Sequence, residues 1–208
     1  MKFITQLWQC ITDFRVPAPV LLWYCRKFHK PFKQNLDYIA LEIITACNLS
    51  CDQCNRSCSK NQAPSREQME VSQIKKFIEQ SVDAGKRWKQ IVVAGGEPTL
   101  HSDFLEIINL LRNYRDEFSK RTRIVVVSNG YGSLTKRVLS ELPDDIVVTN
   151  TEKLPKSYQG HEVYSSAFRD SLTKKPAYYG SGCIVVHVCG MGLTRYGYYS
   201  CGPGASID

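Results

Sequence analysis

The sequence predicts an α/β fold in which parallel strands alternate with crossover helices. Three observations support this prediction. Short runs of β-branched and apolar residues recur along residues 37–150, segments with helical periodicity lie between them, and Gly85, the NGYG stretch and Pro143 end successive segments. Strand–helix alternation of this kind is typical of a parallel sheet covered by its own crossover helices.

The predicted strands are short. We expect them at residues 38–45, 90–94, 123–128 and 145–150, with a further short strand at 183–188. The first of them, YIALEIIT, is apolar and β-branched, which indicates a strand buried on both faces. Residues 151–182 are polar and interrupted by prolines, so no element is assigned there.

The predicted helices carry apolar residues at helical spacing. The first begins with a capping-box pattern at Ser65 and Gln68 and ends at Gly85. The expected inward-facing residues are Met69, Ile74, Phe77, Ile78 and Val82 in the first helix, Leu105, Ile108 and Leu111 in the second, and Leu134, Val138 and Leu142 in the third.

A helical extension is expected to precede the core. Residues 3–14 show helical spacing of apolar side chains, and a basic stretch follows at 25–33. We interpret this part as a helix that caps the core; the alternative is an interfacial helix in peripheral contact with a membrane through residues 3–33. The expected division is an extension at 1–36, a core at 37–182 and a cysteine-rich tail at 183–208.

Composition limits the classes of function. Lys and Arg number 27 against 20 Asp and Glu, which gives a net charge of +7 and suits anionic partners. No aromatic–basic recognition motif is visible, so nucleic acid is not an expected partner. The nine cysteines are odd in number, and polar residues interrupt the apolar N-terminal stretch, so we expect a reducing, cytoplasmic compartment in which cysteines can bind metal.

Three of those cysteines form a dense motif after the first strand. Cys47, Cys51 and Cys54 have C-x3-C-x2-C spacing, and Cys58 follows as an expected bystander. Closely spaced thiolates hold iron–sulfur clusters, and three ligands leave one iron open. Structural zinc usually takes four ligands, often in paired knuckles, and stays an alternative together with plain thiols.

Two other unusual loops also follow strands. GGEP occupies residues 95–98 and SNG occupies residues 128–130. Because the carboxyl ends of parallel strands meet at one edge, we expect the three loops to form one site there.

These motifs together resemble the radical S-adenosylmethionine superfamily over about residues 38–150. The resemblance implies a partial, TIM-like (β/α) barrel, abbreviated in this chain. It also implies that Cys47, Cys51 and Cys54 hold a 4Fe–4S cluster whose fourth iron is chelated by S-adenosylmethionine. The implied activity is of the oxidoreductase type: an electron from a donor such as flavodoxin or ferredoxin cleaves S-adenosylmethionine to a 5′-deoxyadenosyl radical, which takes hydrogen from a substrate.

The resemblance also implies contacts to S-adenosylmethionine. Gly95, Gly96 and Glu97 would contact the methionine amino group, because glycine permits close backbone approach and a carboxylate suits an ammonium. Ser128 and Asn129 would contact the ribose or carboxylate. Gln53 stands where the family usually has an aromatic residue, so its backbone would border the adenine.

The tail resembles the start of the auxiliary-cluster modules called SPASM or Twitch, in an abbreviated or truncated form. Cys183, Cys189 and Cys201 form a tentative second iron–sulfur site, and three reduced thiols are the alternative. Because such modules accompany peptide or protein modification, that is the first expected substrate class. The alternatives are a glycyl-radical activating enzyme, a small-molecule synthase acting on a deazapurine, nucleotide or sugar, and a non-catalytic iron–sulfur or zinc protein.

Overall fold

The computed structural model describes residues 18–51, 54, 56, 58, 67–150, 182, 185–202 and 204. Its helices are α2 (Ala18–Lys27), α3 (Val71–Asp83), the short 3-10 helix η1 (Pro98–Leu100), α4 (Phe104–Glu117), α5 (Ser133–Ser140) and α7 (Val185–Val188). Its strands are β1 (Tyr38–Glu42), β2 (Gln90–Ala94), β3 (Arg123–Ser128), β4 (Val147–Asn150), β5 (Met191–Thr194) and β6 (Gly197–Tyr199).

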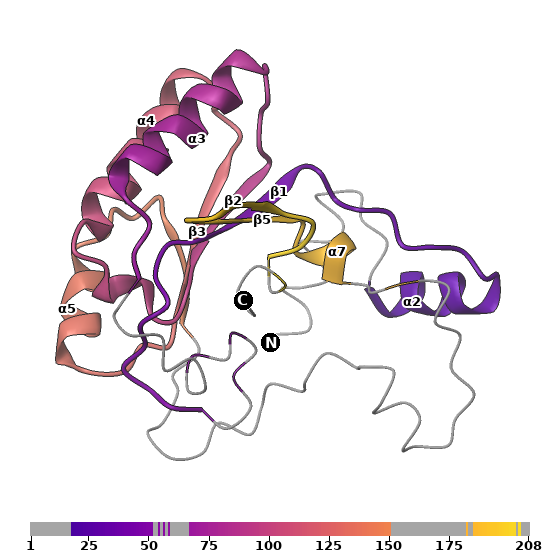
Figure 1. The fold of residues 1–208 in the computed structure, drawn as a ribbon, viewed down its shortest axis with the longest axis horizontal. Coiled ribbons are helices and arrows are strands. Elements are labelled where there is room, and N and C mark those ends of the chain that lie inside the picture. Colours follow the sequence, from indigo (N-terminus) through magenta and orange to yellow (C-terminus); the bar gives the residue numbers. More distant parts are fainter. Residues whose placement is uncertain are drawn as a thin grey trace.

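The strands form one sheet in the order β4-β3-β2-β1-β5-β6. Every neighbouring pair is parallel except the last, in which β5 and β6 are antiparallel. Figure 1 shows α3, α4 and α5 together on one side of this sheet. The expected α/β class with a mostly parallel sheet is therefore confirmed.

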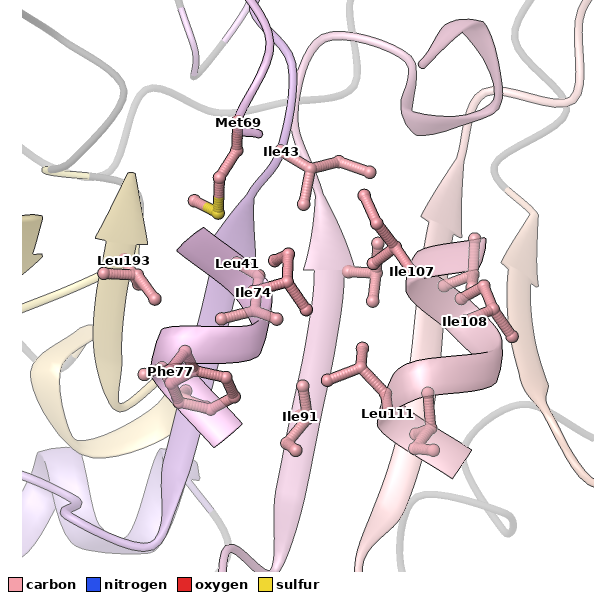
Figure 2. Close-up of a cluster of buried hydrophobic side chains, with 14 of the residues drawn as sticks. Leu41, Ile43, Met69, Ile74, Phe77, Ile91, Ile107, Ile108, Leu111 and Leu193 are labelled. Atoms are coloured by element: carbon pink, nitrogen blue, oxygen red, sulfur yellow. The ribbon is translucent and has the colours of Figure 1, made fainter. Parts of the chain in front are cut away.

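The core lies between the sheet and the two long helices (Figure 2). Strand residues with side chains on the helix-facing side pack against the apolar faces of α3 and α4. The fully buried members include Leu41, Ile43, Ile74, Phe77, Ile91, Ile107, Ile108 and Leu111. This packing fixes the sheet, and therefore the positions of the loops that leave its carboxyl edge.

The helix predictions are confirmed in outline. α3 ends where expected, because Gly85 has a φ of 62° and Lys86 N–H donates to the Ser81 carbonyl at 2.7 Å. The capping box, however, is formed by Glu70 and Gln73, while Gln68 pairs with Ile44 in an isolated bridge. Ser65 lies outside the described residues, and two side chains expected to face inward, Val82 of α3 and Leu134 of α5, are exposed.

The predicted strand at 183–188 is wrong. Val185–Val188 form helix α7, and the added strands come later, from the glycine-rich residues 191–199. Gly190, at a φ of 74°, explains the placement, since a Cβ there would overlap the Tyr38 carbonyl oxygen. Only glycine permits that close approach, so the chain joins β1 after this residue rather than before it.

The N-terminal extension is described only from residue 18 onward, so the expected helix at 3–14 lies outside the described residues. In α2, Cys25 is buried while Val20, Trp23 and Tyr24 are exposed. Among the described residues, no helix has the length and apolar character needed to cross a membrane.

Candidate functional site

The three predicted loops do meet at the carboxyl edge of the sheet. β1 lies beside β2 and β2 beside β3, all parallel, so the segments that follow them leave the sheet together. Backbone hydrogen bonds join the first two segments: Gly96 N–H donates to the Ile44 carbonyl at 2.8 Å and Glu97 N–H to the Ala46 carbonyl at 2.9 Å. The start of the cysteine loop is thereby attached to the GGEP loop.

The two glycines of GGEP are required by this attachment. A Cβ on Gly95 would overlap the Ile44 carbonyl oxygen, and a Cβ on Gly96 would overlap that of Ala46. Gly95 also has a φ of 147°, which side-chain-bearing residues rarely adopt. The two glycines therefore allow close approach to the chain's own backbone. Their contact with the methionine amino group stays a prediction.

Glu97 joins the GGEP loop to the SNG loop. Its side chain is 0% exposed, and it caps η1 by accepting hydrogen bonds from the N–H and hydroxyl of Thr99 at 3.2 and 2.8 Å. The Ser128 hydroxyl donates to the same oxygen at 2.9 Å, and the Asn129 N–H donates to the other oxygen at 2.8 Å. Four protein donors therefore fix this carboxylate at the centre of the edge.

Asn129 connects the SNG loop to the cysteine loop. Its Nδ2 donates to Asn48 Oδ1 at 2.7 Å and lies 3.6 Å from Cys47 Sγ. Asn48 Nδ2 in turn donates to the Tyr131 carbonyl at 2.6 Å. Sequence reasoning missed Asn48, although its position directly after the first cysteine of the motif was an available signal.

Cys47 is half-buried and receives polar donors. The Leu49 N–H donates to its Sγ at 3.4 Å, in addition to Asn129. Burial raises the pKa of the Cys47 thiol, the negative charges of Glu97 and Cys54 add to the rise, and the two donors oppose it. Hydrogen bonds to sulfur also stabilise a metal-bound thiolate.

The remaining cysteines of the loop lie close to one another. Cys54 N–H donates to the Cys51 carbonyl at 3.2 Å, and Cys58 lies against Cys54. The hydrogen bond with Cys54, then burial, raises the pKa of the Cys58 thiol. None of the four cysteines of the loop forms a disulfide, and all four are half-buried.

A buried ion pair attaches the far part of the cysteine loop to β1. Arg56 Nε lies 2.7 Å from Glu42 Oε2, and Arg56 Nη2 lies 2.9 Å from Glu42 Oε1. The side chains are 17% and 5% exposed, respectively. Burial lowers the pKa of Arg56, but the charge of Glu42 and its hydrogen bond, together with smaller contributions from Cys58 and Cys54, outweigh burial, so the net shift of the pKa is upward. Sequence analysis did not single out either residue.

The residues present fit a 4Fe–4S cluster. No three His, Cys, Asp or Glu side chains in the described part of the chain are grouped as ligands of one metal ion. A 4Fe–4S cluster differs because each thiolate binds a different iron, which spreads its ligands over a wider volume. Cys47, Cys51 and Cys54 offer three thiols outside any disulfide on one loop, with N–H donors at Cys47 and the cationic side chain of Arg56 two residues after Cys54.

The tentative second site is only partly described. Cys183 lies outside the described residues, as does Gln53 of the cysteine loop. Cys189 precedes β5 and Cys201 follows β6, and since these strands form an antiparallel hairpin, both cysteines lie at the same end of it. β5 runs parallel to β1 with Met191 beside Ile39, so both cysteines lie near the start of β1. The cysteine loop follows the end of β1, and the five residues of this strand separate its two ends by ~16 Å.

Comparison with known proteins agrees with this arrangement. The family model of the radical SAM superfamily matches residues 41–149, just over half of the chain. GTP 3′,8-cyclase of Actinobacillus pleuropneumoniae serotype 3 (strain JL03) is 28% identical over 100 residues, which are 48% of this chain and 28% of that protein. GTP 3′,8-cyclase of Helicobacter pylori (strain ATCC 700392 / 26695) is 28% identical over 111 residues, covering 53% and 32%.

A solved structure shares the fold. The crystal structure of BtrN in complex with AdoMet and 2-DOIA aligns with a TM-score of 0.50 at 18% identity, covering 83% of this chain and 75% of that one. The curated relatives are matched over about a third of their own length or less. From the family match, with the three motifs at one edge, the chain belongs to the radical SAM superfamily, enzymes that use a 4Fe–4S cluster and S-adenosylmethionine.

Proposed function

We propose that the carboxyl edge of β1, β2 and β3 is where this enzyme reductively cleaves S-adenosylmethionine. Cys47, Cys51 and Cys54 would hold the 4Fe–4S cluster, which when bound supplies the electron for that cleavage. The observation that carries the proposal is the chain of hydrogen bonds from Glu97 through Asn129 to Cys47, since it joins all three loops.

Each loop has a separate role in this proposal. Glu97 places a negative charge at the centre of the edge, where it attracts the ammonium of S-adenosylmethionine. Ser128 donates to Glu97, and Asn129 donates to Asn48 and Cys47. These hydrogen bonds support a role for both residues in holding the SNG loop against the GGEP loop and the cysteine loop. Acceptor positions on Ser128 and Asn129 would suit the ribose hydroxyls, which can donate, whereas a contact with the carboxylate, which only accepts, would require a donor now directed at Glu97, Asn48 or Cys47.

For the substrate we propose a small anionic molecule, with a purine nucleotide first. The curated relatives are GTP 3′,8-cyclases, and the net charge of +7 suits a phosphorylated substrate. Peptide or protein modification, the first expectation from the sequence, has no support from these relatives. Reduction would come from a flavodoxin or ferredoxin.

The test is anaerobic reconstitution followed by counts of iron, sulfide and cleavage product. We expect about four irons per chain and release of 5′-deoxyadenosine and methionine when dithionite and S-adenosylmethionine are added. A Cys47/Cys51/Cys54 triple alanine variant should lose both. Zinc in place of iron would refute the proposal.

The substrate class is tested in the same assay. GTP, a GTP-free mixture of nucleosides and a peptide library are each added to the reconstituted enzyme, and 5′-deoxyadenosine is measured. Stimulation by GTP but not by peptides supports a nucleotide. Stimulation by peptides alone contradicts it, without affecting the assignment of the cleavage site.

A further inference from the structure

We propose that the Glu42–Arg56 ion pair is a positioning element of the cluster site: it holds the cysteine loop against β1 and sets the charge beside the cluster. This inference rests on the proposed function for its electronic part. The pair contains no cluster ligand and no residue of the GGEP or SNG loops.

The location of Glu42 requires a charged partner. It is the last residue of β1, paired in register with Ala94 of β2, and it lies in an otherwise apolar strand. Its side chain is 5% exposed. Burying a carboxylate is costly unless it is paired and hydrogen-bonded, so Glu42 requires a partner at this position.

Arg56 is that partner, and its geometry fixes the loop. Arg56 meets both carboxylate oxygens, through Nε at 2.7 Å and Nη2 at 2.9 Å. Such a two-point contact fixes direction as well as distance, and the single ammonium of lysine cannot reproduce it. Arg56 lies two residues after Cys54, so fixing its side chain also fixes the end of the ligand loop.

Arg56 also lies close to the thiols of the loop. It follows Cys54 by two residues, and its carbonyl accepts a hydrogen bond from Cys58 Sγ at 3.7 Å. Arg56 and Glu42 together are neutral. Removing either one alone leaves an uncompensated charge near the cluster, because the surroundings are buried and screening is weak.

The sign of the effect separates this role from simple loss of structure. Reduction adds a negative charge to the cluster, so an unpaired Arg56 favours the reduced form and an unpaired Glu42 opposes it. Glu42→Gln should therefore raise the reduction potential, and Arg56→Gln should lower it. The double variant Glu42→Gln/Arg56→Gln should lie close to the wild type.

The experiment is a redox titration of each reconstituted full-length variant, followed by the EPR signal of the reduced cluster. We expect about a tenfold change in the reduction equilibrium for each single variant, which is 59 mV for one electron, in opposite directions. Arg56→Lys keeps the charge but loses the two-point contact. The reduction potential of its cluster should therefore equal that of the wild type, while its iron content per chain falls. Glu106→Gln, at the exposed Lys75–Glu106 pair, is the matched control and should change neither.

The pair does not set the charge beside the cluster if the reduction potential shifts in the same direction in both single variants. The same holds if the potential does not shift in variants that keep their full iron content. The positioning role has its own readout in the metal-free chain: amide hydrogen exchange across residues 46–58. Glu42→Gln should speed that exchange, and unchanged exchange overturns it. If the wild type binds no iron–sulfur cluster, the proposed function fails while the exchange experiment still decides the positioning role.

Discussion

The two parts of the carboxyl edge differ in how firmly the protein holds them. In the GGEP and SNG loops, Glu97 is fully buried and receives four protein donors. In the cysteine loop, the four thiols are half-buried, and the described contacts hold the loop near Asn48 on one side and Arg56 on the other.

This difference indicates that protein contacts alone fix the GGEP and SNG loops, which form the part of the edge proposed to bind S-adenosylmethionine. The thiols of the ligand loop are half-buried whereas Glu97 is fully buried, so metal binding should contribute a larger share of the order of that loop. Coupling of metal binding to local folding is common where ligands lie on a loop.

Replacing Cys47, Cys51 or Cys54 singly by alanine should lower the rate of S-adenosylmethionine cleavage by about 100-fold or more, because two protein ligands hold a 4Fe–4S cluster poorly. Iron content and 5′-deoxyadenosine release measure the effect. Cys58→Ala is the control: although Cys58 lies against Cys54, we expect it to retain about four irons. Loss of iron in that variant would make Cys58 a ligand.

Glu97→Gln should disrupt the firmly held part of the edge. An amide NH2 would replace an oxygen that now accepts N–H or O–H donors, leaving buried donors unpaired at a cost of about 1–3 kcal/mol. Removing the charge should also weaken S-adenosylmethionine binding about tenfold or more, because the buried carboxylate attracts the ammonium through surroundings that screen weakly. Urea unfolding and equilibrium dialysis measure the two effects.

If Glu97→Gln kept full S-adenosylmethionine affinity while losing stability, Glu97 would only hold the two loops together. Unchanged stability would contradict the buried network itself.

Gly96→Ala tests the backbone contact between the two parts. The added Cβ would overlap the Ala46 carbonyl oxygen, so the cysteine loop must shift, at about 1–3 kcal/mol. Gly85→Ala is the matched control, because a Cβ there meets nothing within 4 Å and only the φ of 62° opposes it. We expect both variants to lose stability but only Gly96→Ala to lose cleavage activity per folded molecule.

The smallest effect is expected at the other end of β1. Lys89 donates a hydrogen bond to Asp37 and holds the pKa of that carboxyl below its usual value of 3.8, but the side chain is 42% exposed. Asp37→Asn should therefore cost only ~0.5 kcal/mol or less at pH 7, since solvent screens such pairs.

The pH dependence follows from the direction of the Asp37 shift. Because the pKa is lowered in the folded state, the contribution is present above the unfolded-state value and disappears as the pH falls through the folded-state value. The stability difference between wild type and Asp37→Asn should begin to shrink below about pH 4 and go on shrinking as the pH falls through the lowered folded-state pKa. A difference that stays constant over that range would contradict the ion pair as its cause.

Prediction from sequence succeeded where local pattern and edge topology were enough. The bounds of β2 and β3 match the predicted 90–94 and 123–128, because each is an apolar β-branched run between clear breakers. The meeting of the three loops followed from parallel strand order. The substrate, the second cluster and the domain division stay predictions.

Prediction failed where partners distant in sequence decide the outcome. Three of the four residues of α7 are β-branched valines, yet the segment is helical, because the place beside β1 is taken by residues that follow Gly190. Gln68 had the pattern of a helix cap but pairs with Ile44 instead. In each case tertiary contact outweighed a local preference of about 1 kcal/mol or less.

The sequence by itself determined the chemistry of this protein: the thiols at 47, 51 and 54, the GGEP and SNG loops, and their common edge. Tertiary structure alone decided what holds that edge together. Glu97 meets Ser128, Asn129 meets Cys47, and Arg56 meets Glu42, over separations of 31, 82 and 14 residues. Hydrogen bonds and ion pairs act over a few ångströms, so only the packed sheet brings such residues within reach of one another.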